Sequence, residues 1–365
     1  MKYIDFWLFG PELGCVNREI PLIEKMRDQH FSLRIFCHRN HVDYLQKLFP
    51  SIKIIPYKKS IRLYYKKNFD LNLYRSFYNL VIFLAIHAYR EYRFFRKKIQ
   101  QQPPDLIITD FLPHIVCFAA WQEIPVAGVY NYHLDHVSLG KGIVRKALSL
   151  GVKMAYQTMY NLCDIMFLET LKPRLSSPWQ IVSPMVRQVP AFSWSSVLPP
   201  EHYSKPKIFL SLGGNFQGKS FLEKMNKMAS ILPQYTFIIA PRTAKEMRRF
   251  AGYPHLYPVA AVEPHILIAN AQLTVTKAGF QTVSEALAAG KRLLLWDLPT
   301  HSEISETAQF LAKQKITPPP ISAKESPHIL KNAIQNALKF PAPQPIQANG
   351  VEQIYAILEK TFWPM

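Results

Sequence analysis

The chain has 365 residues, 48% of them hydrophobic, which is enough for two domains of ordinary size and argues against global disorder. Its formal net charge of +19 predicts an anionic partner: a nucleic acid, a phosphorylated ligand or an anionic membrane surface. Four widely separated cysteines without a CxxC pair argue against a zinc knot or a disulfide framework and indicate a reducing cytosol. The N-terminal stretch lacks the pattern of a signal peptide, and no apolar run reaches the roughly 18 residues that span a bilayer.

The first half of the sequence alternates short apolar runs with helical patterns. We expect strands at residues 3–9, 33–37 and 52–56, and a helix over residues 16–27. This rhythm predicts a doubly wound sheet, whose ligands bind at the carboxyl ends of the strands. The turn at residues 10–14, directly after the first strand, is therefore a candidate site.

Residues 53–98 mix basic and aromatic side chains, with twelve lysines and arginines against Asp70 and Glu91. This composition suits an anionic lipid surface, where each basic side chain adds about 1 kcal/mol. Single-stranded nucleic acid could bind the same composition by stacking, but no recognisable nucleic-acid module accompanies the charge. The remaining alternative is a buried helix over residues 71–89, flanked by solvated charges.

Two further strands of this half end at polar residues that could take part in catalysis or binding. Residues 105–110 form a buried-type strand ending in Asp110, and residues 125–130 lead into Asn131 and His133. The other elements expected here are helices at 113–121 and 141–161, a strand at 164–168, and a Pro- and Ser-rich linker at 171–206 around a short strand at 180–182.

The second half repeats the β/α rhythm. We expect strands at residues 207–212, 235–240 and 256–259. Helices are expected at residues 220–231, 302–313, 329–338 and 351–362, and residues 265–270 are expected to be the end of another helix. A glycine turn, Gly213-Gly214-Asn215, follows the first of these strands, and Pro241-Arg242 follows the second.

Residues 273–299 predict a strand, a turn containing Gly279, a helix over residues 283–289 that ends at Gly290, and a second strand at 292–296. Because free N–H groups and the positive end of the helix dipole point out of such a turn, a phosphate fits there best. Glu285, one helical turn further, could accept hydrogen bonds from ribose hydroxyls. The alternative is that Gly279 only makes a turn and Glu285 is solvated.

The stretch VTKAGFQTVSEALAAGKRLLLWDLP resembles the donor-binding motif of GT-B glycosyltransferases, most closely the family 28 type. That type includes the N-acetylglucosaminyltransferase that completes the lipid-linked peptidoglycan precursor and the monogalactosyldiacylglycerol synthases. Three further stretches look like parts of the same pattern: IFLSLGGN at 208–215, PDLIITDFLP at 104–113 and IPVAGVYNYH at 124–133.

The resemblance implies how a nucleotide-sugar, usually a UDP-sugar, would be held. Backbone N–H groups of the turn would bind the diphosphate, Glu285 the ribose hydroxyls and Glu303 the donor sugar, while the loop at residues 213–215 closes over the phosphates. The donor-binding residues expected are Gly213, Gly214, Asn215, Arg242, Gly279, Phe280, Gln281, Thr282, Glu285 and Glu303. Neither a cofactor nor a metal ion is expected, because the nucleotide-sugar is a co-substrate and no DxD-type cluster stands at a suitable loop. Ile304 and Thr307 replace the family's glutamine and asparagine, so the sugar stays open.

The family's general base is a histidine in the first turn, but Cys15 stands in its place here. A thiol near its ordinary pKa is a poor base for an alcohol at pH 7. Three residues at strand ends could replace it, with Glu12 and Asp110 ranked above His133. Alternatively Asp110 caps a helix, Glu12 shapes a turn, or the catalytic function is lost.

These observations predict two doubly wound Rossmann-like domains that face each other across a cleft. Residues 1–170 would bind the acceptor, 171–206 link the domains, 207–340 bind the donor, and 341–365 form a helix crossing back onto the N-terminal domain. The activity expected is metal-independent transfer of a hexosyl unit, with inversion, to a hydroxyl of a lipid-linked or membrane-associated acceptor. We expect a cytoplasmic protein at the inner face of the membrane that does not bind nucleic acid. The alternatives are an inactive nucleotide-sugar-binding protein and a sugar-nucleotide epimerase.

Overall fold

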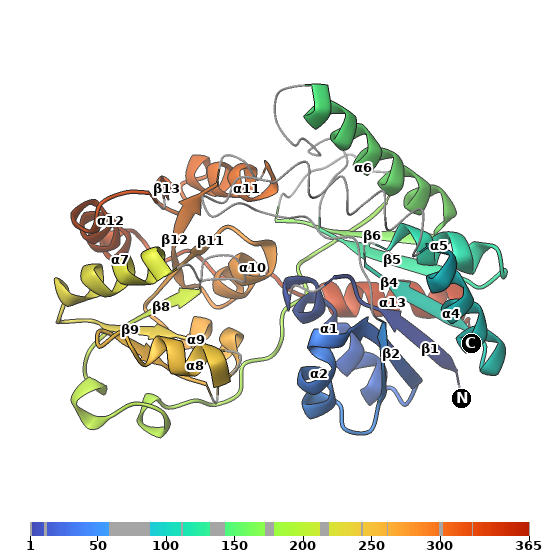
Figure 1. The fold of residues 1–365 in the computed structure, drawn as a ribbon, viewed down its shortest axis with the longest axis horizontal. Coiled ribbons are helices and arrows are strands. Elements are labelled where there is room, and N and C mark those ends of the chain that lie inside the picture. The colour runs from blue at the N-terminus through green and yellow to red at the C-terminus, as the bar shows by residue number, and fades with distance from the viewer. Residues whose placement is uncertain are drawn as a thin grey trace. The chain divides into compact units, whose positions relative to one another are not determined.

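The computed structural model describes most of the chain and divides into two compact units (Figure 1). The described residues are 2–10, 13–57, 88–110, 112–131, 143–171, 179–211, 219–241, 244–260, 262–298, 302–322 and 324–364. The N-terminal unit comprises Met1–Val186 with Ala348–Met365, and the C-terminal unit comprises Arg187–Gln347. The predicted linker, residues 171–206, spans the first of the two points where the chain passes between units, and the domain bounds expected from the sequence stay a prediction.

Within the described residues, seven parallel strands form the sheet of the N-terminal unit, in the order β3-β2-β1-β4-β5-β6-β7. They are β1 (Tyr3–Trp7), β2 (Ser32–His38), β3 (Lys53–Tyr57), β4 (Leu106–Thr109), β5 (Val126–Tyr130), β6 (Ile165–Glu169) and β7 (Gln180–Val182). Consecutive apolar residues form these strands because a parallel sheet is covered on both faces. The order reverses between β1 and β4, so ligands of such a sheet bind where these two strands end.

Helices cover both faces of this sheet, and alternate strand residues pack on opposite sides. On one face, Phe6 and Ile108 pack with α1 (Leu13–Asp28), α2 (Val42–Leu48) and α13 (Gly350–Phe362). On the other, Trp7 and Ile107 pack with α4 (Ala88–Gln101) and α5 (Pro113–Ala120). A further described helix of this unit, α6 (Ile143–Leu162), lies against α5 and β5.

The C-terminal helix α13 belongs to the N-terminal unit, where it lies against α1 and β7. Ile354 and Leu358 of α13 are fully buried in the core that α1 shares. The helix begins in close contact with the residues after β7, because a Cβ atom at Gly350 would collide with the carbonyl oxygen of Ser183.

The described part of the C-terminal unit contains a six-stranded parallel sheet in the order β10-β9-β8-β11-β12-β13. Its strands are β8 (Lys207–Ser211), β9 (Thr236–Ile239), β10 (Leu256–Pro258), β11 (Leu273–Lys277), β12 (Arg292–Asp297) and β13 (Ile321–Ser322). Its helices are α7 (Lys219–Ser230), α8 (Ala244–Phe250), α9 (Pro264–Asn270), α10 (Phe280–Ala288), α11 (Ser302–Lys313) and α12 (Pro327–Lys339). This order reverses between β8 and β11, as it does between β1 and β4 in the other unit.

Most predicted elements are present, and the differences are local. Helix α10 begins at Phe280, three residues earlier than predicted, so the turn before it is shorter. It ends as predicted, since Gly290 has a φ of +62° and the N–H of Lys291 donates to the carbonyl of Ala286. The sequence analysis missed α4 as well as the short elements α2, α8 and β13.

Among the described residues, no helix combines the length and the apolar composition that crossing a membrane requires. The described residues begin again at Ala88 in α4, so all but the last two residues of the predicted helix at 71–89, and most of the basic and aromatic segment, lie outside them.

Candidate functional site

The predicted phosphate turn lies at the reversal point of the C-terminal sheet. Thr276, near the end of β11, pairs with Ser211, the last residue of β8. The chain leaves β11 through Ala278 and Gly279 into α10, and it leaves β8 into residues 212–218. β8 therefore ends beside the turn, and the predicted residues Gly213, Gly214 and Asn215 that follow it lie outside the described part of the chain.

Gly279 is the N-cap of α10, and its backbone does not require a glycine. Its φ of −70° and ψ of 131° are accessible to any residue. A Cβ atom there would meet only the Cε of Lys277, at 3.8 Å. Because Gly279 has no side chain, the space in front of the first turn stays open and no side chain caps it. Phe280, Gln281 and Thr282 form this first turn. A ligand anion can approach the backbone closely in that space.

Glu285 lies one turn inside α10 and is held by the same helix. The amide of Gln281 donates a hydrogen bond of 3.0 Å to its Oε1. Burial raises the pKa of Glu285 to about 7, opposed by that hydrogen bond and by the charge of Arg187. Glu285 as a whole residue is only partly buried, and a donor hydroxyl that reached its carboxyl group would favour the ionised form.

Two residues that the sequence analysis did not select complete the surroundings of Glu285. Arg187 forms an ion pair with Glu263, at 3.3 Å between Nη1 and Oε2, and both charges act on the Glu285 carboxyl. Glu263 is the N-cap of α9, which packs against α10. Burial, aided by Arg187, lowers the pKa of His265 in α9 to about 4, so this imidazole is neutral at pH 7.

The structure does not describe the side chains of the other two predicted donor residues, Arg242 and Glu303. Arg242 falls outside the described residues, and Glu303 lies in α11 with its side chain undescribed. The same helix is tied to the sheet, because the Ser305 hydroxyl donates to the Asp297 carboxylate at the end of β12, at 3.2 Å.

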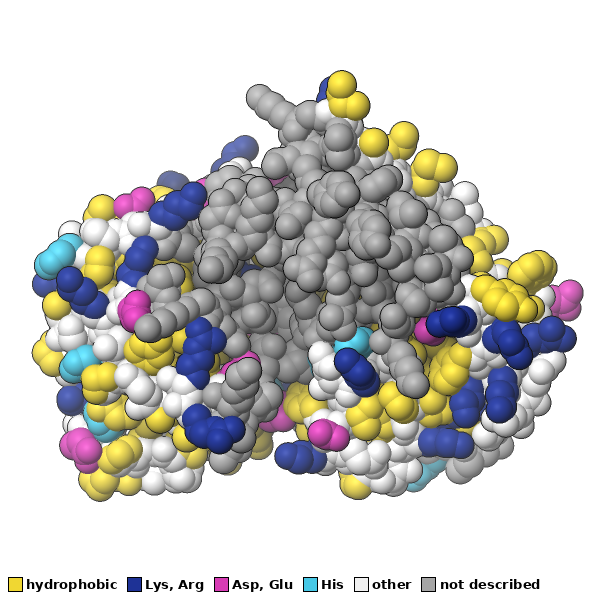
Figure 2. Space-filling model, in the orientation of Figure 1, with side chains coloured by type: hydrophobic (Ala, Val, Ile, Leu, Met, Phe, Trp, Pro, Cys, Tyr) yellow, Lys and Arg dark blue, Asp and Glu magenta, His cyan; other side chains and the backbone are white. Residues whose placement is uncertain are grey.

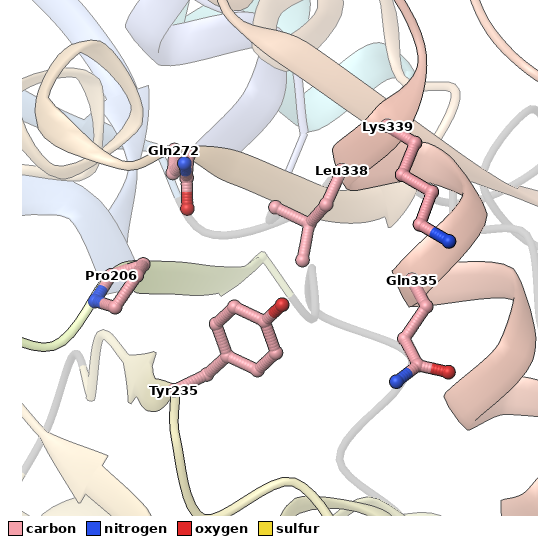
Figure 3. Close-up of a pocket in the computed structure, with 6 residues that line it drawn as sticks. All are labelled: Pro206, Tyr235, Gln272, Gln335, Leu338 and Lys339. Atoms are coloured by element: carbon pink, nitrogen blue, oxygen red, sulfur yellow. The ribbon is translucent and has the colours of Figure 1, made fainter.

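A surface pocket of about 360 Å³ lies at the opposite edge of the same sheet (Figure 3). Pro206, Tyr235 and Gln272, which line it, directly precede β8, β9 and β11. The side chains of Tyr235 and Leu338 point toward one another across it. Because the predicted phosphate turn follows the carboxyl end of β11, this pocket is not part of the predicted donor site.

At the carboxyl edge of the N-terminal sheet, one arginine forms ion pairs with three buried carboxyl groups. Arg18 of α1 is 3% exposed and pairs with Asp110, with Glu19 at 3.4 Å and with Glu169 at 3.6 Å. Its Nη1 also donates to the side-chain carbonyl of Asn131, at 2.8 Å. Arg18 thus connects α1 with residues at or just beyond the ends of β4, β5 and β6.

The charges of this cluster do not balance if all its groups ionise. Burial lowers the pKa of Arg18, but the neighbouring carboxylates, Asp110 first, raise it further, so the guanidinium stays charged. Burial raises the pKa of Glu19 to about 8 and that of Glu169 to about 7, against the opposing charge of Arg18. At pH 7 the Glu19 carboxyl group therefore keeps its proton.

The structure gives the three predicted base residues different surroundings. Asp110 is fully buried and paired with Arg18, which leaves it no exposed surface toward an acceptor. Glu12 and His133 lie outside the described residues. Cys15 is the third residue of α1 and only partly exposed, and it interacts electrostatically with Arg18, one turn further along the helix.

Just before α1, the chain turns at Gly10. Its φ of +71° favours a glycine, and its N–H donates to the hydroxyl oxygen of Tyr57, at 3.1 Å. Tyr57 in turn donates to the carbonyl of Leu8, so β3 fixes the start of the predicted first turn. Within the described part of the chain, no three His, Cys, Asp or Glu side chains are grouped so as to hold a metal ion.

No family model matches this sequence, and no curated protein matches it by sequence. Solved structures are nevertheless similar over nearly the whole chain. The spinosyn rhamnosyltransferase SpnG complexed with thymidine diphosphate has a TM-score of 0.67 at 13% identity, covering 98% of this chain and 100% of that one. MurG of Acinetobacter baumannii has a TM-score of 0.55 at 14% identity, covering 99% and 100%. A putative UDP-N-acetylglucosamine 2-epimerase from Listeria monocytogenes has a TM-score of 0.63 at 13% identity, covering 100% and 98%.

Glycosyltransferases prevail among the similar structures. At these identities the similarity establishes the fold, which is the α/β architecture of GT-B glycosyltransferases with two parallel sheets. The predicted fold class is confirmed, whereas membership of family 28 stays a prediction.

Proposed function

We propose that the protein is a glycosyltransferase that moves a sugar from a nucleotide-sugar, with a UDP-sugar as donor, to a hydroxyl acceptor with inversion. The observation that carries the proposal is the uncapped N-terminus of α10 at the sheet reversal, one turn from Glu285. Neither backbone strain nor a neighbouring residue explains Gly279, whereas close approach of a diphosphate would explain it.

In the proposed reaction the acceptor oxygen forms a bond to the anomeric carbon while the bond from that carbon to the diphosphate oxygen breaks. The diphosphate leaves with the bonding electrons, and the first-turn N–H groups and dipole of α10 stabilise its charge. The acceptor proton passes to a base in the N-terminal unit. The buried ion pair with Arg18 supports a structural role for Asp110, which leaves Glu12 and His133 as candidates for that base.

Donor binding can be tested by calorimetric titration of UDP and thymidine diphosphate. We expect Glu285→Gln to weaken binding of the preferred nucleotide tenfold or more, because hydrogen bonds to an ionised group contribute about 1.5–3 kcal/mol. Glu223→Gln, at an exposed position on α7, is the matched control. If neither nucleotide binds the wild type, or if both glutamine variants bind like the wild type, the ribose assignment fails.

The pH dependence provides a second test of the same site. Since burial raises the pKa of Glu285 to about 7, its carboxylate is lost as the pH falls through 7. Wild-type affinity should therefore decrease between pH 8 and pH 6, while the affinity of Glu285→Gln should change much less.

We extend the proposal to a lipid-linked acceptor and to peripheral contact with the inner face of the membrane. The described part of the basic segment supports this, because α4 exposes Arg90, Arg93, Arg96 and Lys97 and contains one acid, Glu91. A non-transferring binding protein would bind nucleotide without turnover, and Cys15→His would not restore activity. The epimerase alternative, favoured by one similar structure, predicts a sugar product from the donor without any acceptor.

A further inference from the structure

The pocket at the amino edge of the C-terminal sheet combines apolar and polar walls (Figure 3). Its volume of about 360 Å³ is within the range of pockets that bind small organic molecules. Pro206, Tyr235 and Gln272 line it from the segments that lead into β8, β9 and β11, and α12 lines it with its last residues. Figure 3 shows the Tyr235 ring and the Leu338 side chain pointing toward one another, with the Gln272 amide reaching toward the space between them.

The polar side chains of this pocket are not used by the protein itself. Within the described part of the chain, the side chains of Tyr235, Gln272, Gln335 and Lys339 form no hydrogen bond and no ion pair. Each of the two amides offers a donor group and an acceptor oxygen, the tyrosine hydroxyl offers both, and the ammonium group offers donors. A ligand with several hydroxyl groups could therefore bond to all four side chains.

We propose that this pocket binds one hexopyranose unit of a saccharide, at a site distinct from the predicted donor site. A pyranose ring has an apolar face of C–H groups and a rim of hydroxyl groups that both donate and accept. The C–H face would pack on the Tyr235 ring, because the face of an aromatic ring is electron-rich and attracts C–H groups. The rim hydroxyls would bond with the amides of Gln272 and Gln335, and Lys339 would donate to a further hydroxyl oxygen.

Other classes of small ligand match the pocket less well. A phosphate group or a nucleotide would lie beside the carboxyl end of α12, where the helix dipole is negative, and Lys339 is the only charged side chain in the lining. Figure 2 shows lysine and arginine side chains scattered over the C-terminal unit, so a single lysine does not indicate a phosphate site. A wholly apolar ligand would remove water from the two amides without replacing their hydrogen bonds.

This inference goes beyond the proposed function and does not rest on it. None of the lining residues belongs to the predicted donor set, and the pocket lies at the edge of the sheet opposite to the predicted phosphate turn. The bound saccharide would be held there and not transferred. Titration of UDP and thymidine diphosphate against the same variants separates the two proposals, because the pocket variants should bind nucleotide like the wild type.

The test is ligand-observed NMR titration with the methyl glycosides of glucose, galactose and N-acetylglucosamine. We expect at least one glycoside to bind the wild type, and sorbitol, which has hydroxyl groups but no ring face, not to bind. Gln272→Ala with Gln335→Ala should weaken binding about tenfold, through the loss of two hydrogen-bonding groups. Tyr235→Ala should weaken it by about tenfold as well. Gln122→Ala with Tyr89→Ala, at exposed positions of the N-terminal unit, should bind like the wild type.

Circular dichroism verifies that each variant folds, and the two exposed glutamine and amide positions keep the test valid if Tyr235→Ala does not. The proposal is overturned if no glycoside binds the wild type, or if the double glutamine variant binds glycosides as tightly as the wild type does. Binding of sorbitol equal to that of the glycosides would also overturn it, since the ring face would then contribute nothing. Benzoate is the last probe: if it binds with a loss in the pocket variants while no glycoside binds, the pocket takes an aromatic acid instead.

Discussion

Replacing Glu19 by glutamine should remove a loss of folding stability that grows with pH in the N-terminal unit. Glu19 is 1% exposed and shares one guanidinium with two other carboxyl groups. Its Oε2 has no hydrogen-bond partner among the described residues. Glutamine keeps the volume and the oxygen that accepts from Arg18 but cannot ionise, so the variant loses only the titration.

The magnitude follows from the raised pKa. In the unfolded chain Glu19 titrates near 4.5, whereas in the folded chain burial raises its pKa to about 8. Below pH 4.5 the group is neutral in both states and costs nothing. As the pH rises above 4.5, Glu19 ionises in the unfolded chain and stabilises it, while the folded chain keeps the proton. The free energy of unfolding therefore decreases until about pH 8. At about 1.36 kcal/mol for each pKa unit, the wild type should lose about 3 kcal/mol relative to Glu19→Gln between pH 5 and pH 7.5.

Urea unfolding followed by circular dichroism over this pH range measures the difference. The free energies of unfolding of wild type and Glu19→Gln should diverge as the pH rises, with the variant the more stable at pH 7.5. Glu352→Gln, at an exposed position on α13, should follow the wild type. Parallel curves for wild type and Glu19→Gln would refute the assignment of a buried proton to Glu19.

Three further substitutions test the packing. Arg18→Met leaves the buried carboxyl groups without a counter-ion and should lower the free energy of unfolding by about 3–5 kcal/mol, measured by urea titration at pH 7. Gly350→Ala places a methyl group against the Ser183 carbonyl, so the melting temperature should fall by an amount equivalent to about 1–3 kcal/mol as α13 is displaced. Gly290→Ala, at a φ of +62° and with Pro345 Cγ 3.1 Å from the new Cβ, should cost about 1–2 kcal/mol in the same assay.

The strands could be predicted well because parallel sheets leave a simple signal. A strand covered on both faces needs consecutive apolar residues, and runs such as LIIT in β4 and TFII in β9 satisfy this without reference to the rest of the chain. The start of α10 was missed because Phe280 and Thr282 have low helix propensity, and the contacts of a buried helix outweigh it. The seven-residue helices α2 and α8 are too short for a full apolar periodicity.

The candidate site could be predicted only where its residues are close in sequence. Glu285 and Gln281 are four residues apart on one helix, so the sequence alone permits their hydrogen bond. Arg187 acts on Glu285 from about one hundred residues earlier in the chain, and nothing in its local sequence indicates this. In the same way, the sharing of Arg18 among Glu19, Asp110 and Glu169 depends on the strand order and could not be read from any motif.

The buried cluster also reduces the number of candidates for the general base of the proposed reaction. A general base must reach the acceptor hydroxyl, and Asp110 is paired with Arg18 and has no exposed surface. The two other candidates adjoin the cluster in sequence, since Glu12 precedes the first residue of α1 and His133 lies two residues beyond Asn131. Arg18 is fixed to both segments, because it belongs to α1 and donates to Asn131. We therefore expect the position of either residue to depend on Arg18, whereas the predicted donor residues lie in the other unit. A substitution of Arg18 that still folds should therefore lower kcat while nucleotide affinity stays unchanged, and a parallel loss of both would show that the cluster has no such positioning role.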